Sequence, residues 1–336
     1  MNRFERRSTR HDVSARRGGS ARTAVGVLAL SAIVVGTLAG CAGSSAGTES
    51  TSAASTADAT TTDATTTTTT GSDPDRLDSA TEEQNKAIVL ALLASAFPDP
   101  SDPAALSAVS ENVSVDAASP GADPATARTG PQAILQRFIS IHSRVPGAQA
   151  VVKHSAADGD LVAVHWQATS APSDEFSGEA EVDLFRLDAG RIVQFWSFSQ
   201  SVPSTTASGN SMFSDLFGSP TVPDSEAKED EQRQLAVGGY DTLFRDQDAS
   251  VLDRLWSPDY LQHNPLAGNG TAVLKQFLAG ASGFPPMESA VSLADGDLVW
   301  TFAGSAGEQG ALTVADIFRV SDGTIVEHWD VVPTAG

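Results

Sequence analysis

The chain contains few cysteines, few tyrosines and few basic residues. It contains one cysteine and two tyrosines, and 21 lysines and arginines stand against 42 aspartates and glutamates. A single cysteine excludes an internal disulfide, so each folded domain must be held together by its own core. The formal net charge of -21 disfavours nucleic acid and anionic lipid headgroups, because both attract basic surfaces. No nucleic-acid partner is predicted.

A third of the basic residues lie at the start of the chain. Seven arginines lie within residues 1–40, and an apolar run follows at 24–40. That run is shorter than the ~20 residues of a membrane-spanning helix. A basic start, a short apolar run and small residues are typical of a secretion signal, so residues 1–40 are predicted to be a signal peptide.

The stretch Leu-Ala-Gly-Cys at 38–41 resembles the lipobox of bacterial lipoproteins. The resemblance implies that Cys41 is lipidated and that acyl chains hold the protein on the outer face of the cell membrane, in a bacterial envelope. An uncleaved signal anchor with a chance cysteine is the alternative. Residues 42–72 are almost all Ala, Gly, Ser and Thr, which favours disorder. We therefore expect Cys41 and the segment up to residue 78 to form a tether.

Two segments of the chain repeat each other. SAADGDLV at 155–162 matches SLADGDLV at 292–299 in seven of eight positions, and VDLFRLDAGRIVQFW at 182–196 aligns with ADIFRVSDGTIVEHW at 315–329. Repeats of this length indicate a duplicated domain. We predict one domain at 79–203, a linker at 204–225 and a second domain at 226–336.

Each copy begins with a helical pattern and continues with strands. The run at 79–97 is helical in pattern, and in the second copy the apolar residues Ala236, Tyr240, Leu243 and Phe244 share one helix face. Alternating runs follow, separated by Asp-Gly pairs at 158–159, 295–296 and 322–323, which is the signal for hairpins. Helices followed by antiparallel strands predict an α+β fold.

The second copy resembles the SnoaL-like polyketide cyclase family of the nuclear transport factor 2-like superfamily. DYLQHNP at 259–265 and VADIFRVSDGTIVEHWDVV at 314–332 carry the resemblance; the first copy shares mainly the fold pattern. The resemblance implies a curved antiparallel sheet wrapped round helices, with an apolar pocket inside. Members include aldol-type cyclases and isomerases that move a proton beside a carbonyl, and others only bind ligands or partners. From this resemblance we expect a small apolar or carbonyl-containing ligand, and no cofactor is predicted.

The last strand of each copy suggests which face carries function. Strict alternation puts Ile325 and Trp329 on one face and His328 and Asp330 on the other. The first copy keeps the Ile and Trp but has Phe195 and Ser197 on the second face. We therefore predict that the shared face packs and that the His/Asp face lines the pocket. Members of the superfamily often pair through their sheets, so the resemblance also implies that the two copies pair with each other as an intrachain pseudo-dimer.

The resemblance also implies roles for five residues. Asp330 is the candidate general base, because burial raises the pKa of a carboxyl group, and His328 would hold or exchange a proton beside it. His263 would polarise a carbonyl, Asn264 would donate to an enolate oxygen and Tyr260 would add a hydroxyl. Turnover and ligand binding without turnover both remain open.

Several structural readings compete with that site. Asp330 and His328 could pair with each other or with Arg319, and Asn264-Pro265 could be a turn and nothing more. Asp316 and Arg319 recur in the first copy as Asp183 and Arg186, which favours a structural pair.

A metal site is a further alternative, since the two histidines and the aspartate of this group, His263, His328 and Asp330, would suit zinc. The sequence has no tight ligand spacing such as HExxH, so no metal site is predicted. In the first copy Ala117 and Ala118 replace His263 and Asn264. His165 aligns with Phe302 and is expected to face the first pocket. No complete second site is predicted.

Overall fold

The computed structural model describes residues 79–121, 127–218, 224–280, 285–307 and 311–333. The predicted signal peptide, Cys41 and the tether lie outside the described residues. Among the helices that are described, none combines the length and the hydropathy needed to cross a membrane.

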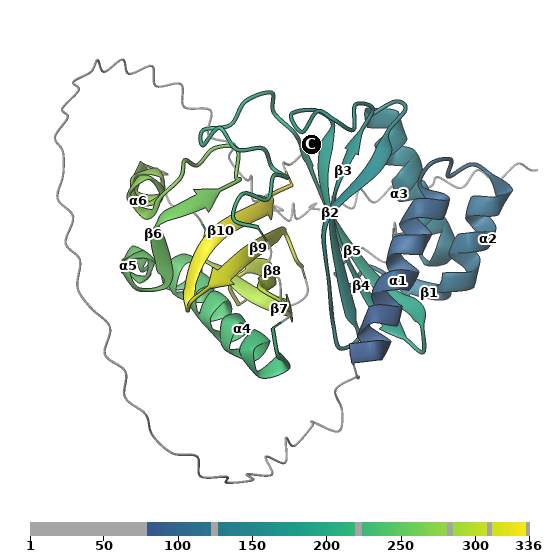
Figure 1. Ribbon diagram of the computed structural model, residues 1–336. Coiled ribbons are helices and arrows are strands. Elements are labelled where there is room, and N and C mark those ends of the chain that lie inside the picture. Colours follow the sequence, from purple (N-terminus) through teal and green to yellow (C-terminus); the bar gives the residue numbers. More distant parts are fainter. Residues whose placement is uncertain (1–78, 122–126, 219–223, 281–284, 308–310, 334–336) are drawn as a thin grey trace, which may run out of the picture. The chain divides into compact units, whose positions relative to one another are not determined.

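The first domain packs three helices on one face of a five-stranded sheet (Figure 1). Buried Val89, Leu92 and Ala96 recur at helical spacing along the first helix and enter the core between the layers. The strand order is β1-β5-β4-β3-β2. In chain order the elements are α1 (Ser79–Ala96), α2 (Pro103–Asn112), β1 (Val113–Ala118), α3 (Gly130–Arg144), β2 (Gln149–Asp158), β3 (Leu161–Thr169), β4 (Glu179–Asp188) and β5 (Arg191–Ser201).

The second domain repeats this plan with the strand order β6-β10-β9-β8-β7. Ala236, Tyr240 and Leu243, predicted to share a helix face, are buried in its core. The elements are α4 (Glu226–Tyr240), the π-helix η1 (Asp241–Arg245), the 3-10 helix η2 (Ala249–Val251), α5 (Leu252–Leu255), β6 (Trp256–Gln262), α6 (Thr271–Gly280), β7 (Met287–Asp295), β8 (Leu298–Ser305), β9 (Val314–Ser321) and β10 (Thr324–Val331).

The predicted α+β class and the tandem arrangement are confirmed, but the sheets are mixed rather than wholly antiparallel. In each domain the first strand pairs in parallel with the last, β1 with β5 and β6 with β10. A helix follows each first strand before the remaining strands begin. The connection between the two parallel strands thus contains a helix and three further strands. A long connection permits parallel pairing, whereas a tight hairpin cannot. The other pairs are antiparallel hairpins, and the three Asp-Gly pairs lie at hairpin turns as predicted.

The last strand of each copy contains an irregularity that strict alternation did not predict. The register shifts between Ile325 and Glu327, and the equivalent shift in the first copy falls between Ile192 and Gln194. An extra residue reverses which face the later side chains occupy. Ile325 therefore packs in its own domain's core, whereas Trp329 belongs to a different cluster. The prediction that Ile and Trp share a face is wrong in both copies.

One cluster of buried side chains contains residues of both copies. Trp196 and Phe198 belong to it together with Phe302 and Trp329, and the Phe198 and Phe302 ring centroids are 5.7 Å apart. Met212 and Phe213 from the predicted linker are buried in the same cluster, whereas Leu216 and Phe217 are each 51% exposed. These contacts support the pseudo-dimer, which stays a prediction.

Two stacked histidines lie at this cluster. His165 was expected to face the first pocket; instead its Nδ1 lies 3.1 Å from Nδ1 of His154, and its ring stacks on Phe213. His154 also contacts Trp329, with ring centroids 4.6 Å apart. Burial lowers the pKa of His154 to about 4, and the nearby charges act in both directions: Asp215 and Glu327 raise it, while Arg319 and His263 lower it.

We expect the His154→Gln variant to lose part of the acid sensitivity of the fold. Because the folded pKa is depressed from 6.5 to about 4, the unfolded chain takes up this proton first as the pH falls. The stabilising contribution is complete above pH 6.5 and is lost between 6.5 and 4, by up to about 3 kcal/mol. Urea unfolding of both proteins at several pH values measures the difference. Parallel pH profiles would show that His154 does not contribute.

Candidate functional site

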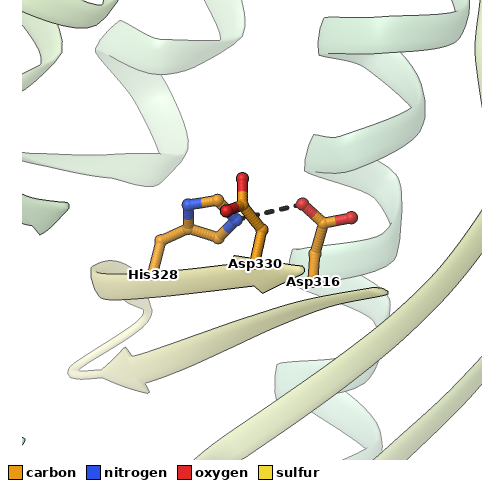
Figure 2. A group of neighbouring side chains, drawn as sticks. All are labelled: Asp316, His328 and Asp330. Carbon is orange, nitrogen blue, oxygen red and sulfur yellow. Dashed lines mark hydrogen bonds and ion pairs between the residues drawn. The ribbon is translucent and has the colours of Figure 1, made fainter. Parts of the chain in front are cut away.

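Three ionisable side chains meet on the helix-covered face of the second sheet. His328 and Asp330 come from β10 and Asp316 comes from the neighbouring strand β9, directly opposite Asp330 (Figure 2). His328 Nε2 lies 3.1 Å from Asp316 Oδ1. One atom of each residue that could ligate a metal ion lies within 4.8 Å of the corresponding atoms of the other two. The His328 ring stacks on Phe318, which belongs to the core of this domain. We call Asp316, His328 and Asp330 the His/Asp cluster.

Gln262 fixes the tautomer of His328. Its side-chain oxygen accepts a 2.8 Å hydrogen bond from the Asn264 backbone N–H, so it is the oxygen, not the nitrogen, that lies 3.0 Å from His328 Nδ1. Nδ1 must therefore carry a proton and donate it to Gln262. In a neutral imidazole, Nε2 is then an acceptor that faces Asp316. The Gln262 amide group in turn donates to the Tyr260 hydroxyl.

Asn264 holds one side of Asp330. Its side-chain nitrogen donates to Asp330 Oδ2 at 2.6 Å, and its side-chain oxygen accepts from the Leu266 backbone N–H. The Asn264-Pro265 step is therefore both a turn and a contact to the cluster. Sequence reasoning placed Asn264, His328 and Asp330 in one group, and the structure brings these three together, with Tyr260 linked through Gln262.

Burial shifts all three groups of the cluster towards neutrality. It raises the pKa of Asp316 to about 8 and that of Asp330 to about 6, the latter against the opposing influence of His328. Burial also lowers the pKa of His328 to about 4, although Asp330 acts in the opposite direction. Near neutral pH the cluster thus holds a protonated Asp316, a neutral His328 and a largely ionised Asp330. A protonated Asp316 can donate to His328 Nε2, in agreement with the tautomer that Gln262 imposes.

His263 does not join the cluster. Its Nε2 lies 2.9 Å from Glu327 Oε1, its Nδ1 lies 2.6 Å from the Ser211 carbonyl oxygen, and its ring stacks on Trp329. Glu327 and Trp329 lie on the opposite face of the sheet from His328, because successive residues of a strand alternate between its faces. The prediction that His263 joins Asn264, His328 and Asp330 in one group is therefore wrong, and the role of His263 at a carbonyl stays an untested prediction.

Arg319 and Asp316 do not form a pair either. The Arg319 guanidinium is fully buried and contacts three carboxylates, those of Glu327, Asp297 and Asp215. Three positions along a strand reverse the side-chain direction, so Asp316 points instead to His328. Sequence reasoning thus missed two members of the site, Asp316 and Gln262. Gln262 could have been found from the sequence, because it stands two residues after Tyr260 and residues two apart on a strand share a face.

The first domain offers a direct comparison at the same positions. Asp183, which aligns with Asp316, accepts hydrogen bonds from Arg137 and Ser197 on one oxygen and from the Trp166 indole on the other. Ser197 occupies the place of Asp330, and Phe195 that of His328. Both oxygens of Asp183 therefore have donors. The first domain uses the shared aspartate within a closed polar network.

Two cavities lie away from the His/Asp cluster. One, of about 190 Å³, is bordered by Ser119, Pro120, Gly121, Trp196, Ser197, Phe198, Ala311 and Leu312. A smaller one in the first domain is bordered by helix residues, Trp166 and Asp183. Neither borders His328 or Asp330, so the apolar pocket that the resemblance implies for the second domain stays a prediction.

Comparison with known families settles the membership of both copies. The model described as "SnoaL-like domain" matches residues 89–195 and 237–328, which together make up more than half of the chain. The chain belongs to the SnoaL-like domain family. Both SnoaL-like copies match, including the first, whose resemblance by sequence was weak. No curated protein is similar enough to this chain to match.

Solved structures match one SnoaL-like domain at a time. A proposed isomerase of the SnoaL-like family from Agrobacterium tumefaciens strain C58 is 19% identical, covers 35% of this chain and 99% of its own length, and has a TM-score of 0.30. IdmH, a proposed polyketide cyclase from Streptomyces antibioticus, is 25% identical over 35% of this chain and 92% of its own, with a TM-score of 0.27. A proposed SnoaL-like polyketide cyclase from Jannaschia sp. CCS1 is 21% identical over 37% and 91%, with a TM-score of 0.30.

Proposed function

We propose that this chain is an exported, lipid-anchored protein whose second SnoaL-like domain binds a small, mostly apolar ligand that contains a carbonyl group. The observation that carries the proposal is the difference between the aligned aspartates. Both oxygens of Asp183 have donors, whereas Asp316 Oδ2 and Asp330 Oδ1 have no hydrogen-bond partner among the described residues. Buried acceptors without partners are costly, and they gather at functional sites. In this proposal they face the weakly acidic hydrogens beside the carbonyl group of the ligand and not its carbonyl oxygen.

Proton transfer beside the carbonyl is the second candidate function. Asp330 has one oxygen fixed by Asn264, which orients the carboxylate, and one oxygen without a partner. A positioned base needs this arrangement, since the free oxygen must reach the proton that it removes. The Tyr260 hydroxyl accepts from Gln262 and keeps its own hydrogen, so in this proposal Tyr260 donates to the substrate oxygen. The chemistry would be that of an isomerase or an aldol-type cyclase.

A thermal-shift screen of the purified mature chain tests ligand binding. We suggest a panel of small ketones that includes β-tetralone, an apolar bicyclic ketone with weakly acidic protons beside its carbonyl. A ligand of the folded state raises the melting temperature, and at a concentration of 100 Kd it stabilises by about 2.7 kcal/mol. We expect one class of apolar ketones to do so. A panel in which apolar alcohols and hydrocarbons of equal size stabilise as well as ketones would contradict recognition of the carbonyl.

The membrane anchor is tested by replacing Cys41. We expect Cys41→Ser to move nearly all of the protein from the membrane fraction to the soluble fraction, because acyl chains bury methylene groups worth about 0.8 kcal/mol each. Fractionation of cells followed by detergent phase partitioning measures the change. Ser44→Ala, three residues away in the predicted tether, is the matched control. Membrane retention of the Cys41 variant would indicate an uncleaved signal anchor instead.

The first SnoaL-like domain is assigned a supporting role in this proposal. Its aspartate is occupied by Arg137 and Ser197, and its aromatic residues Trp196 and Phe198 pack in the cluster that contains Trp329. These features suit a scaffold that pairs with the second domain as an intrachain pseudo-dimer.

A further inference from the structure

Two carboxylate oxygens in the His/Asp cluster lack partners despite deep burial. Asp316 is 4% exposed and Asp330 is 7% exposed, yet Asp316 Oδ2 and Asp330 Oδ1 have no hydrogen-bond partner among the described residues. Figure 2 shows both carboxylates beside the His328 ring. Leaving a buried acceptor unsatisfied costs about 1–3 kcal/mol, and more when it is charged. Each of these oxygens therefore calls for a positively charged or donating partner.

The histidine of the cluster also presents an acceptor to its neighbours. Because His328 Nδ1 donates to Gln262, the lone pair of Nε2 is directed at Asp316. One proton on Asp316 would satisfy the contact to Nε2. That proton would leave Asp330 Oδ1 without a donor, because Asn264 donates to the other oxygen, Oδ2. A single cation can satisfy the nitrogen and both carboxylates at once.

We propose that Asp316, His328 and Asp330 bind one divalent metal ion of the zinc type. One imidazole nitrogen and two carboxylates are a donor set that zinc accepts, and three protein ligands leave a fourth position open. Donors at about 2.0–2.1 Å from a tetrahedral ion are spaced about 3.3 Å apart, close to the 3.1 Å between His328 Nε2 and Asp316 Oδ1. The widest spacing in the cluster is below 4.8 Å, so a small movement of one carboxylate completes the set.

The groups behind the three ligands are arranged as they are in metal sites. A metal-binding histidine usually donates its other ring N–H to an oxygen, as Nδ1 of His328 does to Gln262. Ligating carboxylates are usually hydrogen-bonded in turn, as Asp330 is by Asn264. The first domain lacks this arrangement, since Phe195 and Ser197 stand where His328 and Asp330 do. One ion per chain is therefore expected.

This inference goes beyond the proposed function, because metal binding requires neither a carbonyl ligand nor turnover. The test is a cobalt(II) titration of the metal-free, purified mature chain, followed by visible absorption spectra and by thermal unfolding. We expect one equivalent to bind with d–d absorption bands and to raise the melting temperature, and zinc to displace it. Asp316→Asn is expected to weaken binding at least about 100-fold, since even loss of an outer partner costs 10–100-fold.

Two further variants guard against a trivial loss of binding. Asn264→Ala keeps all three ligands but removes the hydrogen bond to Asp330, together with the bond that Asn264 accepts from the Leu266 N–H. It is expected to weaken cobalt binding 10–100-fold, and thermal unfolding without metal shows whether the fold is kept. His154→Gln changes the contact between His154 and His165, which do not belong to the His/Asp cluster, and is the control that should leave the titration unchanged. The proposal is overturned if the wild-type chain binds no stoichiometric cobalt, or if Asp316→Asn and Asn264→Ala both bind it as wild type does. Since the titration contains no ketone, its failure and a failure of carbonyl binding are told apart.

Discussion

Replacing Asp330 with asparagine is expected to leave the binding of β-tetralone nearly unchanged and to slow exchange of its acidic protons at least about 100-fold. Asparagine keeps the shape of aspartate, and its amide oxygen can still accept the hydrogen bond from Asn264. Its amide nitrogen cannot take up a proton, so a general base is lost while the binding surface stays. Proton NMR of the ketone in deuterated buffer measures exchange, and a chelator in the buffer keeps a bound metal out of the comparison.

The aligned position in the first domain supplies the control for this experiment. Ser197→Ala changes the residue that aligns with Asp330 and should leave proton exchange at the wild-type rate. Equal exchange rates for wild type and Asp330→Asn would remove the proposed role of Asp330 as a base. Loss of ketone binding in Asp330→Asn would instead mean that the carboxylate holds the ligand.

The second large effect is expected at Arg319, on the opposite face of the same sheet. Arg319→Met should destabilise the second domain by about 3–5 kcal/mol, because it leaves buried carboxylates without their shared cation. Glu327 is fully buried, and Asp297 and Asp215 also lose their partner. Urea unfolding followed by tryptophan fluorescence measures the change, since the guanidinium lies 5.6 Å from the Trp329 ring centroid.

The duplicated domain again offers a matched variant. Arg186 aligns with Arg319 but pairs with one partly exposed carboxylate, Asp160, and its own side chain is 36% exposed. Exposed pairs of this kind contribute about 0–1 kcal/mol, so Arg186→Met should change the unfolding free energy little. Similar losses in both variants would contradict the account of Arg319 as the centre of a buried network.

The features predicted correctly from the sequence depend on local patterns. The Asp-Gly pairs located the hairpins, helical periodicity located α1 and α4, and the repeat revealed the tandem domains. His328 and Asp330 were placed together because residues two apart on a strand share a face. This rule holds at 328 and 330 because both residues follow the irregularity near Val326.

The errors come from features without a local sequence signal. The extra residue in β10 shifts the register by one, which sets Asp316 opposite Asp330; an uninterrupted hairpin would have put Ala315 there. Nothing in the sequence around Val326 predicts such a bulge. His263 was grouped with Asn264 by family resemblance, although neighbouring residues in an extended chain point in opposite directions. The turn at Asn264, which Gln262 stabilises, directs the Asn264 side chain to Asp330 but leaves His263 on the other face.

The central claim is that function resides in the second SnoaL-like domain, while the first supports it. Hydrogen exchange measured by mass spectrometry, with and without β-tetralone, tests this claim most directly on the wild-type chain. Ligand binding should slow amide exchange in peptides from 256–264 and 314–331 and leave the aligned first-domain peptides from 179–201 unchanged. Protection confined to 179–201, or equal protection of both copies, would contradict the claim.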